Sequence, residues 1–250
     1  MSQSKRELRA QRKAAREAKE RAEALAASRR RRTWRLLGAT AVAAVAVAIA
    51  AAVSASGGDS EPPVAGSDAA RLVAGIPESD GVLGDPDAPI TVTEFVDPQC
   101  PICAQASEQA LPHLINTYVK TGKVKLQART LSFLGPDSVK AAKFAAGAAE
   151  QGKLWAFLET FYASQGAENS GYVTDDFLRG IAKAAGVDAD AAFEYAETAG
   201  AQKFLDTADG DAQALGVDST PTFVMNRNGT NQIIAVGLDD LQAKLDEALS

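Results

Sequence analysis

The chain has only two cysteines among its 250 residues, Cys100 and Cys103, and a single histidine, His113. A zinc site usually takes four such ligands, so zinc binding by these residues alone is disfavoured. A structural disulfide would usually join distant segments, and a bond between residues three positions apart constrains the chain little. There is also no third or fourth cysteine to recharge the pair internally. These absences favour reversible chemistry at one dithiol.

Acidic residues are scarce at the N-terminus and basic residues are scarce elsewhere. Residues 1–35 carry 13 Lys and Arg against 4 Asp and Glu, whereas residues 36–250 carry 13 against 28. Such asymmetry indicates two environments. Residues 5–32 contain no aromatic side chain between their basic residues, which argues against nucleic-acid binding. We expect a solvated basic helix there, next to anionic lipid headgroups.

Residues 36–53 lack any charged side chain. A helix of that length spans about 27 Å, close to the roughly 30 Å hydrocarbon core of a bilayer. Because basic residues crowd only its N-terminal end, the sequence predicts a single-pass cell-membrane protein with residues 1–35 in the cytoplasm. The alternatives are a cleaved signal peptide and a buried core helix. The anchor and the signal peptide both place the rest of the chain outside, where disulfides persist.

The remaining chain divides into a linker and one domain. Residues 54–68 are rich in Gly, Ser and Pro and predict a flexible linker. Residues 69–250 are long enough to bury a full core. Hydrophobic periodicity predicts strands at 72–76, 90–96, 123–131, 222–225 and 232–236, with a hairpin turn at Asn228-Gly229. It predicts helices from the cysteines to residue 120 and at 137–150, 153–164, 174–185, 188–198, 200–214 and 239–249, with Thr174 and Asp188 as N-caps. This order predicts an α/β sheet with a helical insertion at about 137–214.

The two cysteines lie where the strand at 90–96 gives way to a helix. Attack on a disulfide needs a thiolate, and a helix N-terminus lowers the pKa of a cysteine placed there. Pro101 suits the first helical turn because its missing N–H has no helical partner. The spacing brings Cys103 onto the same face as Cys100. Cys100 can therefore attack a substrate disulfide, and Cys103 can resolve the mixed disulfide.

Two segments carry a family resemblance. Residues 84–103 (GDPDAPITVTEFVDPQCPIC) and 216–224 (GVDSTPTFV) resemble the DsbA-like branch of the thioredoxin superfamily. The resemblance covers roughly residues 70–250 and implies a thioredoxin-like fold with a helical insertion. It implies that Cys100 is the exposed nucleophile, Cys103 the buried resolving thiol, and Thr220-Pro221 a cis-proline loop that binds an extended substrate. Without it, a trans proline that opens a strand would be the simpler interpretation of Pro221.

Glu94 matches the acidic residue that the family places beneath its active site. A carboxylate on an otherwise apolar strand is partly desolvated, so its pKa should rise, and it could carry the proton of Cys103. The alternation of residues 90–96 does not decide whether Glu94 is buried or points to solvent. The dipeptide Pro101-Ile102 departs from the best-known oxidant of the family, which has a histidine there. We therefore expect a less depressed Cys100 pKa and a less oxidising disulfide.

The sequence predicts a membrane-anchored thiol–disulfide oxidoreductase that forms or exchanges disulfides in exported proteins, with no bound cofactor and no metal. Its substrate would be an extended or unfolded polypeptide. A separate redox partner would recharge the cysteines, and for an oxidase the family suggests a quinone-linked membrane protein. Oxidase, isomerase and reductase directions stay open. A different class, a peptide-binding or copper-delivery module on the same scaffold, is the second hypothesis.

Overall fold

The computed structural model describes residues 67–237 and 241–249. The basic segment predicted at 1–35, the membrane span predicted at 36–53 and nearly all of the linker predicted at 54–68 lie outside these residues. Within the two described ranges, none of the helices has the length and apolar character needed to cross a bilayer.

The first described element corrects two predictions. Helix α2 spans Ser67–Val73, so the last two residues assigned to the linker are helical. The short strand predicted at 72–76 is wrong, because those residues end α2 and turn through Gly75, whose φ is 76°. The apolar residues that suggested a strand instead pack inward, as Val73 does with 5% exposure.

A six-stranded mixed sheet forms the centre of the domain, in the order β1-β2-β4-β3-β5-β6. Strands β3 and β4 pair in parallel, and every other neighbouring pair is antiparallel. The strands span Glu78–Ser79 (β1), Val82–Leu83 (β2), Ile90–Val96 (β3), Val124–Thr130 (β4), Thr222–Arg227 (β5) and Thr230–Val236 (β6). Strands β3 to β6 were predicted, whereas the short β1 and β2 were not.

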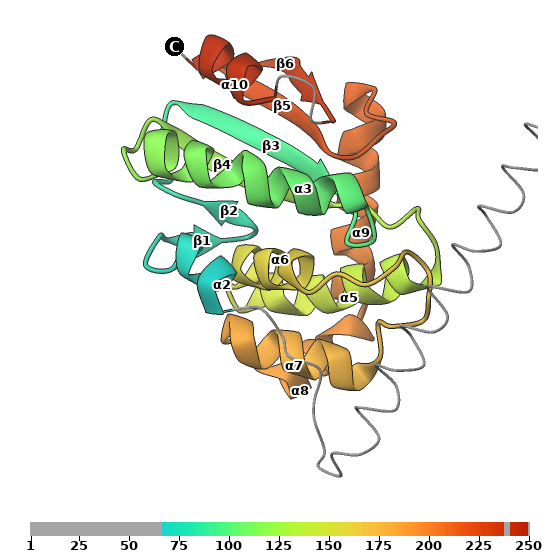
Figure 1. Ribbon diagram of the computed structural model, residues 1–250. Helices are drawn as coiled ribbons and strands as arrows, with labels where there is room; N and C mark the ends of the chain where they lie inside the picture. Colours follow the sequence, from blue (N-terminus) through green and yellow to red (C-terminus); the bar gives the residue numbers. More distant parts are fainter. Residues whose placement is uncertain (1–66, 238–240, 250) are drawn as a thin grey trace, which may run out of the picture. The chain divides into compact units, whose positions relative to one another are not determined.

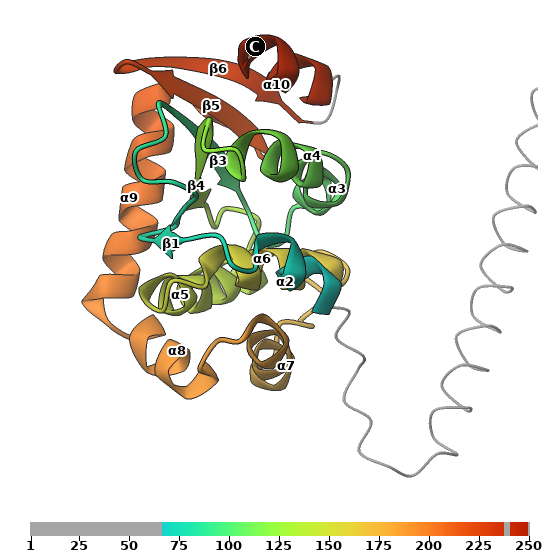
Figure 2. The ribbon, with the colours of Figure 1, turned by 90° about the vertical axis from the view of Figure 1, so that its left-hand side faces the viewer.

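Helices cover both faces of this sheet and one of its edges. Helix α9 crosses one face, while α3, α4 and α10 lie on the other (Figure 2). Helices α5 to α8 form a block beside the β1–β2 edge, with α2 against α6 (Figure 1). Their bounds are Pro101–Gln109 (α3), Leu111–Leu114 (α4), Pro136–Glu150 (α5), Leu154–Ala163 (α6), Asp175–Ala185 (α7), Ala189–Ala196 (α8), Ala199–Leu215 (α9) and Leu241–Leu249 (α10).

The helical insertion sits between β4 and β5, as predicted, and its ends follow local chemistry. The N-caps predicted at Thr174 and Asp188 are confirmed, because their side chains accept the N–H groups of Phe177 and Ala191 at 3.1 Å each. Gly216 ends α9 in the left-handed conformation, with φ 69°. That conformation costs glycine little and turns the chain back toward β5.

The helix predicted to run unbroken from the cysteines to residue 120 is interrupted. Helix α3 ends at Gln109, and a π-helical segment, η1, spans Ile115–Val119. Pro112 explains the break, because it has no N–H for the carbonyl one turn earlier and its ring collides with that carbonyl. The first segment, α3, therefore ends soon after the turn that carries the cysteines.

Strand β3 lies between β4 and β5, so both of its edges are hydrogen-bonded, and helices cover both faces of the sheet (Figure 2). Val92 and Phe95, which point to opposite faces, are both 0% exposed. Glu94 shares the face of Ile90 and Val92 and is only 5% exposed. The strand thus carries a carboxyl group into the core on the side where α3 packs.

Candidate active site at the start of helix α3

Cys100 is the N-cap of α3, one turn after β3 ends. The Cys100 N–H donates to the Asp97 carbonyl at 3.0 Å, which closes the turn between strand and helix. Pro101 occupies the first helical position, and the Cys103 N–H donates to the Cys100 sulfur at 3.3 Å. The strand-to-helix junction inferred from the sequence is therefore present, and it brings both thiols to the same helix end.

The surroundings shift the pKa values of the two thiols in opposite directions. Hydrogen bonding from the Cys103 thiol, opposed by burial and helped by the N–H groups of Cys103 and Ile102, lowers the pKa of Cys100 to about 6. Burial, followed by the hydrogen bond that the Cys103 thiol donates to the Cys100 sulfur, raises the pKa of Cys103 well above its usual value. At neutral pH, Cys100 is the thiolate and Cys103 holds the proton.

The prediction that Cys100 is exposed is wrong, although Cys100 is more exposed than Cys103. Cys100 is 5% exposed and Cys103 is 0% exposed, so only their order agrees with the prediction. The loop before β5 covers the sulfur of Cys100, which lies 3.4 Å from the Thr220 carbonyl oxygen and donates to it when protonated. A substrate must therefore meet this sulfur beside that loop.

The Thr220–Pro221 peptide bond is cis, as the family resemblance implied. Strand β5, which starts at the next residue, pairs with β3, and this pairing holds the loop against the cysteine turn. The Pro221 carbonyl accepts the Gly237 N–H at 2.8 Å. The loop is thus tied to the hairpin behind it and faces Cys100 with the Thr220 backbone.

Glu94 lies on the same side of the sheet as the cysteine helix. Burial, followed by the nearby carboxyl of Glu159, raises the pKa of Glu94 to about 8. Glu94 in turn contributes to the raised pKa of Cys103. Its carboxyl group is therefore close to the buried thiol and holds a proton at neutral pH, as the sequence predicted for the buried alternative.

Two further acidic residues belong to this site and were not predicted. Asp97 is 0% exposed, and its carboxylate accepts the N–H groups of Gln99, Phe133 and Leu134 and the hydroxyl of Ser138 at 2.6–3.2 Å. The second is Glu159, 3% exposed, which accepts the Ser107 hydroxyl at 2.7 Å. Glu159 is the one charged residue of the apolar helix α6, and that isolation is the sequence signal that could have identified it.

His113 has a structural partner. Its Nε2 lies 2.8 Å from Asp246 Oδ1 on α10, and Tyr118 donates to the same oxygen at 2.8 Å. Within the described part of the chain, no group of three or more His, Cys, Asp or Glu is placed to hold a metal ion. The candidate site is therefore a dithiol with nearby carboxyl groups.

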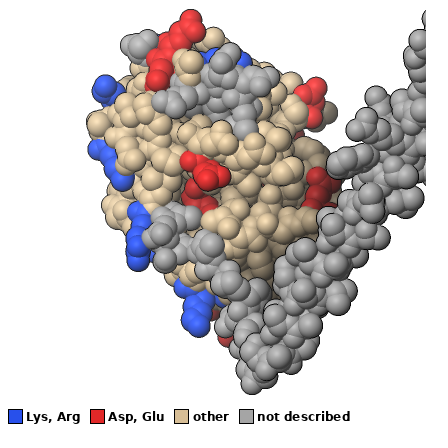
Figure 3. Space-filling view, in the orientation of Figure 1, with Lys and Arg blue, Asp and Glu red and all other residues tan. Residues whose placement is uncertain are grey.

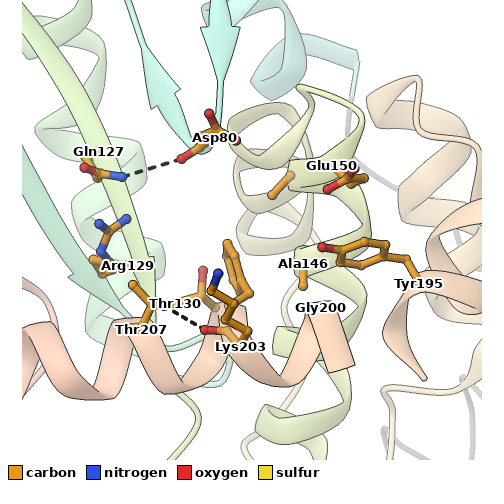
Figure 4. A pocket seen from close by; sticks show the side chains of 13 residues that line it. Asp80, Gln127, Arg129, Thr130, Ala146, Glu150, Tyr195, Gly200, Lys203 and Thr207 are labelled. Carbon is orange, nitrogen blue, oxygen red and sulfur yellow. Dashed lines mark hydrogen bonds between the residues drawn. The ribbon is translucent and has the colours of Figure 1, made fainter. Parts of the chain in front are cut away.

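A separate pocket of about 330 Å³ lies between β4, α5 and α9 (Figure 4). Neither cysteine lines it. The Arg129 guanidinium pairs with Asp211 at 2.5 Å beside it, and the buried Thr130 hydroxyl has no hydrogen-bond partner. Its labelled polar lining consists of Asp80, Gln127, Arg129, Thr130, Glu150, Tyr195, Lys203 and Thr207.

Comparison with known proteins identifies the family to which this fold belongs. The family model described as Thioredoxin matches residues 78–247. A probable disulfide bond formation protein D from Bacillus cereus is 30% identical over 173 residues, which cover 67% of this chain and 77% of that protein. One from Bacillus anthracis is 37% identical over 105 residues, covering 40% of this chain and 48% of that relative, about half its length.

A solved structure agrees with this fold. The crystal structure of oxidised BdbD from Bacillus subtilis superposes with a TM-score of 0.60 at 24% identity and covers 71% of this chain and 95% of that one. The family model extends over nearly all of the described domain, from β1 to α10. The chain therefore belongs to the DsbA-like family of thioredoxin-fold thiol–disulfide oxidoreductases.

Proposed function

We propose that this chain is a membrane-anchored oxidase that forms disulfides in exported polypeptides, using Cys100 and Cys103. The observation that carries the proposal is the position of the Cys100 sulfur, between the Cys103 N–H at 3.3 Å and the Thr220 carbonyl at 3.4 Å. The first contact stabilises a thiolate, and the second places it against a backbone that an extended chain can pair with. The names of the Bacillus relatives support the direction of disulfide formation.

The reaction begins with the oxidised pair. A substrate thiolate attacks the Cys100 sulfur, so that a substrate–Cys100 disulfide forms, the Cys100–Cys103 bond breaks and Cys103 leaves with the electron pair. A second substrate thiolate then attacks the substrate sulfur of this mixed disulfide and releases the Cys100 thiolate. The substrate loses two electrons and the dithiol gains them.

The acidity of Cys100 sets this direction. A thiol of low pKa is the better leaving group, and a pKa of about 6 makes Cys100 leave readily in the second step. Stabilising its thiolate also stabilises the reduced protein, which makes the disulfide a stronger oxidant. This occurs without a histidine in the dipeptide, because N–H groups of the helix and the Cys103 thiol supply the stabilisation. Whether the disulfide is less oxidising than that of the family's best-known oxidant stays a prediction.

Glu94 supplies the proton that Cys103 needs. Cys103 is fully buried, so an uncompensated thiolate would be costly there. Glu94 is protonated at neutral pH and close to Cys103, so it donates as the Cys100–Cys103 bond breaks and recovers the proton on reoxidation. Its position on β3 supports this role more directly than any feature of the sequence.

An extended polypeptide is the substrate. The Thr220 and Pro221 backbone offers it hydrogen-bonding partners, and exposed apolar side chains flank the loop. Ile102 follows Cys100 and is 37% exposed, and Val236, which pairs with Thr222 behind the loop, is 50% exposed. Unfolded chains present both backbone and apolar side chains, whereas folded ones hide them.

The uncharged stretch at 36–53 anchors the protein, with residues 1–35 in the cytoplasm and the domain outside. Reoxidation needs an external acceptor, because the chain has no further cysteine. A quinone-linked membrane protein would receive the two electrons through a second mixed disulfide with Cys100. Anchoring keeps the domain near such a partner.

The test uses the detergent-solubilised full chain and a reduced peptide with two cysteines. Cys100→Ser should abolish oxidation of the reduced peptide. Cys103→Ser, given the disulfide-bonded form of the same peptide, should attack it with Cys100 and release one peptide thiolate. The covalent complex should accumulate until dithiothreitol releases it, because Cys103 is no longer there to resolve it. Complex formation by neither variant would refute these roles. Titration against glutathione should give a potential well above that of the glutathione pool, and a potential near that of thioredoxin would make the protein a reductase.

A further inference from the structure

Glu159 is a buried carboxyl group that the proposed reaction does not yet use. It lies on α6 and accepts the Ser107 hydroxyl at 2.7 Å. Ser107 belongs to α3 and sits one turn beyond Cys103 on the same helix. Glu159 is therefore tied directly to the helix that carries the reactive pair, although it comes from the helical insertion.

A cavity of about 530 Å³ connects Glu159 to the surface. It is lined by buried Glu159 and Ser107 and by exposed Gln105 and Glu108, so it runs from the core to solvent. In the space-filling view, acidic side chains gather near the centre of this face, over the junction of α3 and α6 (Figure 3). Water in the cavity can therefore reach Glu159, whereas Glu94 does not line it.

Glu94, on the face of β3 toward α3, interacts electrostatically with Glu159. After burial, the charge of Glu159 is the cause that raises the pKa of Glu94. Burial, opposed by the Ser107 hydroxyl, raises the pKa of Glu159 to about 7. Two carboxyl groups in a dry site do not ionise together easily, so the pair retains at least one proton near neutral pH.

The other titratable groups around α6 do not offset the raised pKa values of Glu94 and Glu159. Glu108 on α3 and Tyr162 on α6 line the same cavity, and Cys103 and Arg71 belong to helices that pack against α6. Among the described residues, no basic side chain is a cause of the pKa of either Glu94 or Glu159. The charged residues of α5 and α7 likewise contribute to neither.

We infer that Glu159 is the outer member of a two-carboxyl proton route that links the cavity between α3 and α6 to Glu94 and Cys103. When the Cys100–Cys103 bond breaks, Cys103 takes the proton of Glu94, Glu94 takes that of Glu159, and Glu159 recovers one from water in the cavity. Each transfer passes directly or through one water molecule. Reoxidation of the dithiol runs the same transfers outward. Glu159 acts through Glu94, so it is a positioning residue, and the inference rests on the proposed function.

The test compares Glu159→Gln with Glu94→Gln and the double variant in the full chain. Glutamine keeps an oxygen for the Ser107 hydroxyl, so the helix contact survives. Single-turnover oxidation of a reduced peptide is followed from pH 6 to 9. We expect Glu159→Gln to slow the reaction about tenfold at pH 8, less than the full effect of a general acid. The double variant should be no slower than Glu94→Gln alone.

A second readout separates this role from a structural one. Removing the Glu159 charge should lower the pKa of Glu94. The alkaline limb of the pH–rate profile, along which Glu94 loses its proton, therefore moves to lower pH in Glu159→Gln. Glu194→Gln, an exposed residue of α8, is the matched control and should change neither rate nor profile. An unchanged profile in Glu159→Gln, or a double variant in which the two losses multiply, would overturn the inference.

The two proposals fail in different ways. If Cys103→Ser still accumulates the peptide complex while Glu159→Gln behaves like the unmodified protein, the dithiol mechanism stands and the proton route is wrong. If Cys100→Ser still oxidises the peptide, the proposed function itself is wrong.

Discussion

The two faces of the sheet hold their ionisable side chains differently. On the α3 face, Glu94 and Glu159 are buried, and no basic side chain among the described residues is a cause of either pKa. On the α9 face, Arg129 is matched by Asp211 at 2.5 Å. An unpaired buried acid exchanges its proton near neutral pH, and that is the face on which the cysteines lie.

The largest expected effect is on stability against pH. In the unfolded chain both acids titrate near 4.5, whereas folding raises the pKa of Glu94 to about 8 and that of Glu159 to about 7. The folded protein thus binds more protons, so its unfolding free energy falls as pH rises from about 4.5 to about 8. Urea unfolding followed by circular dichroism should show that the unfolding free energy of Glu94→Gln falls less over this range, by about 5 kcal/mol at most. Equal slopes for both proteins would contradict the burial of an ionisable Glu94.

The next effect is on rate. Glu94→Gln should slow peptide oxidation about 100-fold at pH 7 to 8, because Cys103 then leaves without a proton donor. Arg129→Met on the opposite face is the control and should leave the rate within about twofold, since a paired charge moves no proton. Stopped-flow oxidation of a reduced peptide measures both. If the Arg129 variant were the slower one, the contrast between the faces would be lost.

Much of the fold and part of the candidate site could be predicted from the sequence. The cysteine turn, β3, β4 and the helices α5 to α9 follow from local periodicity and caps. The strands β1 and β2 have two residues each, too few to show a period, and they exist only through pairing with β4. The face of Glu94 depended on which neighbours flank β3, and the burial of Glu159 on the docking of α6 against α3. Neither is encoded locally.

A smaller effect is expected for the ion pair itself. Arg129→Met should lower the unfolding free energy by about 1 kcal/mol, because its side chain is 21% exposed and that of Asp211 is 44% exposed. Asp211→Asn should cost a similar amount, and the double variant little more. Urea unfolding at low and high salt tests this. Fully additive losses would mean that the two side chains act separately.

The smallest effect is expected farther from both sites, at α10. Asp246 accepts from Tyr118 and contacts His113, each at 2.8 Å, and its side chain is 42% exposed. Asp246→Asn should lower the unfolding free energy by about 0.5 kcal/mol and leave the peptide-oxidation rate unchanged. A change in the rate would show that Asp246 on α10 influences the reaction of the cysteines. It would then no longer count as a purely structural charge.

The four hydrogen bonds that converge on Asp97 join the turn before Cys100 to the loop that opens the helical insertion, through Phe133, Leu134 and Ser138. Phe133 is 55% exposed and stands at that loop. A displacement of that loop would therefore be transmitted, through one carboxylate, to the turn that carries Cys100. The Asp97 carboxylate thus fixes the position of the helical insertion relative to the reactive sulfur.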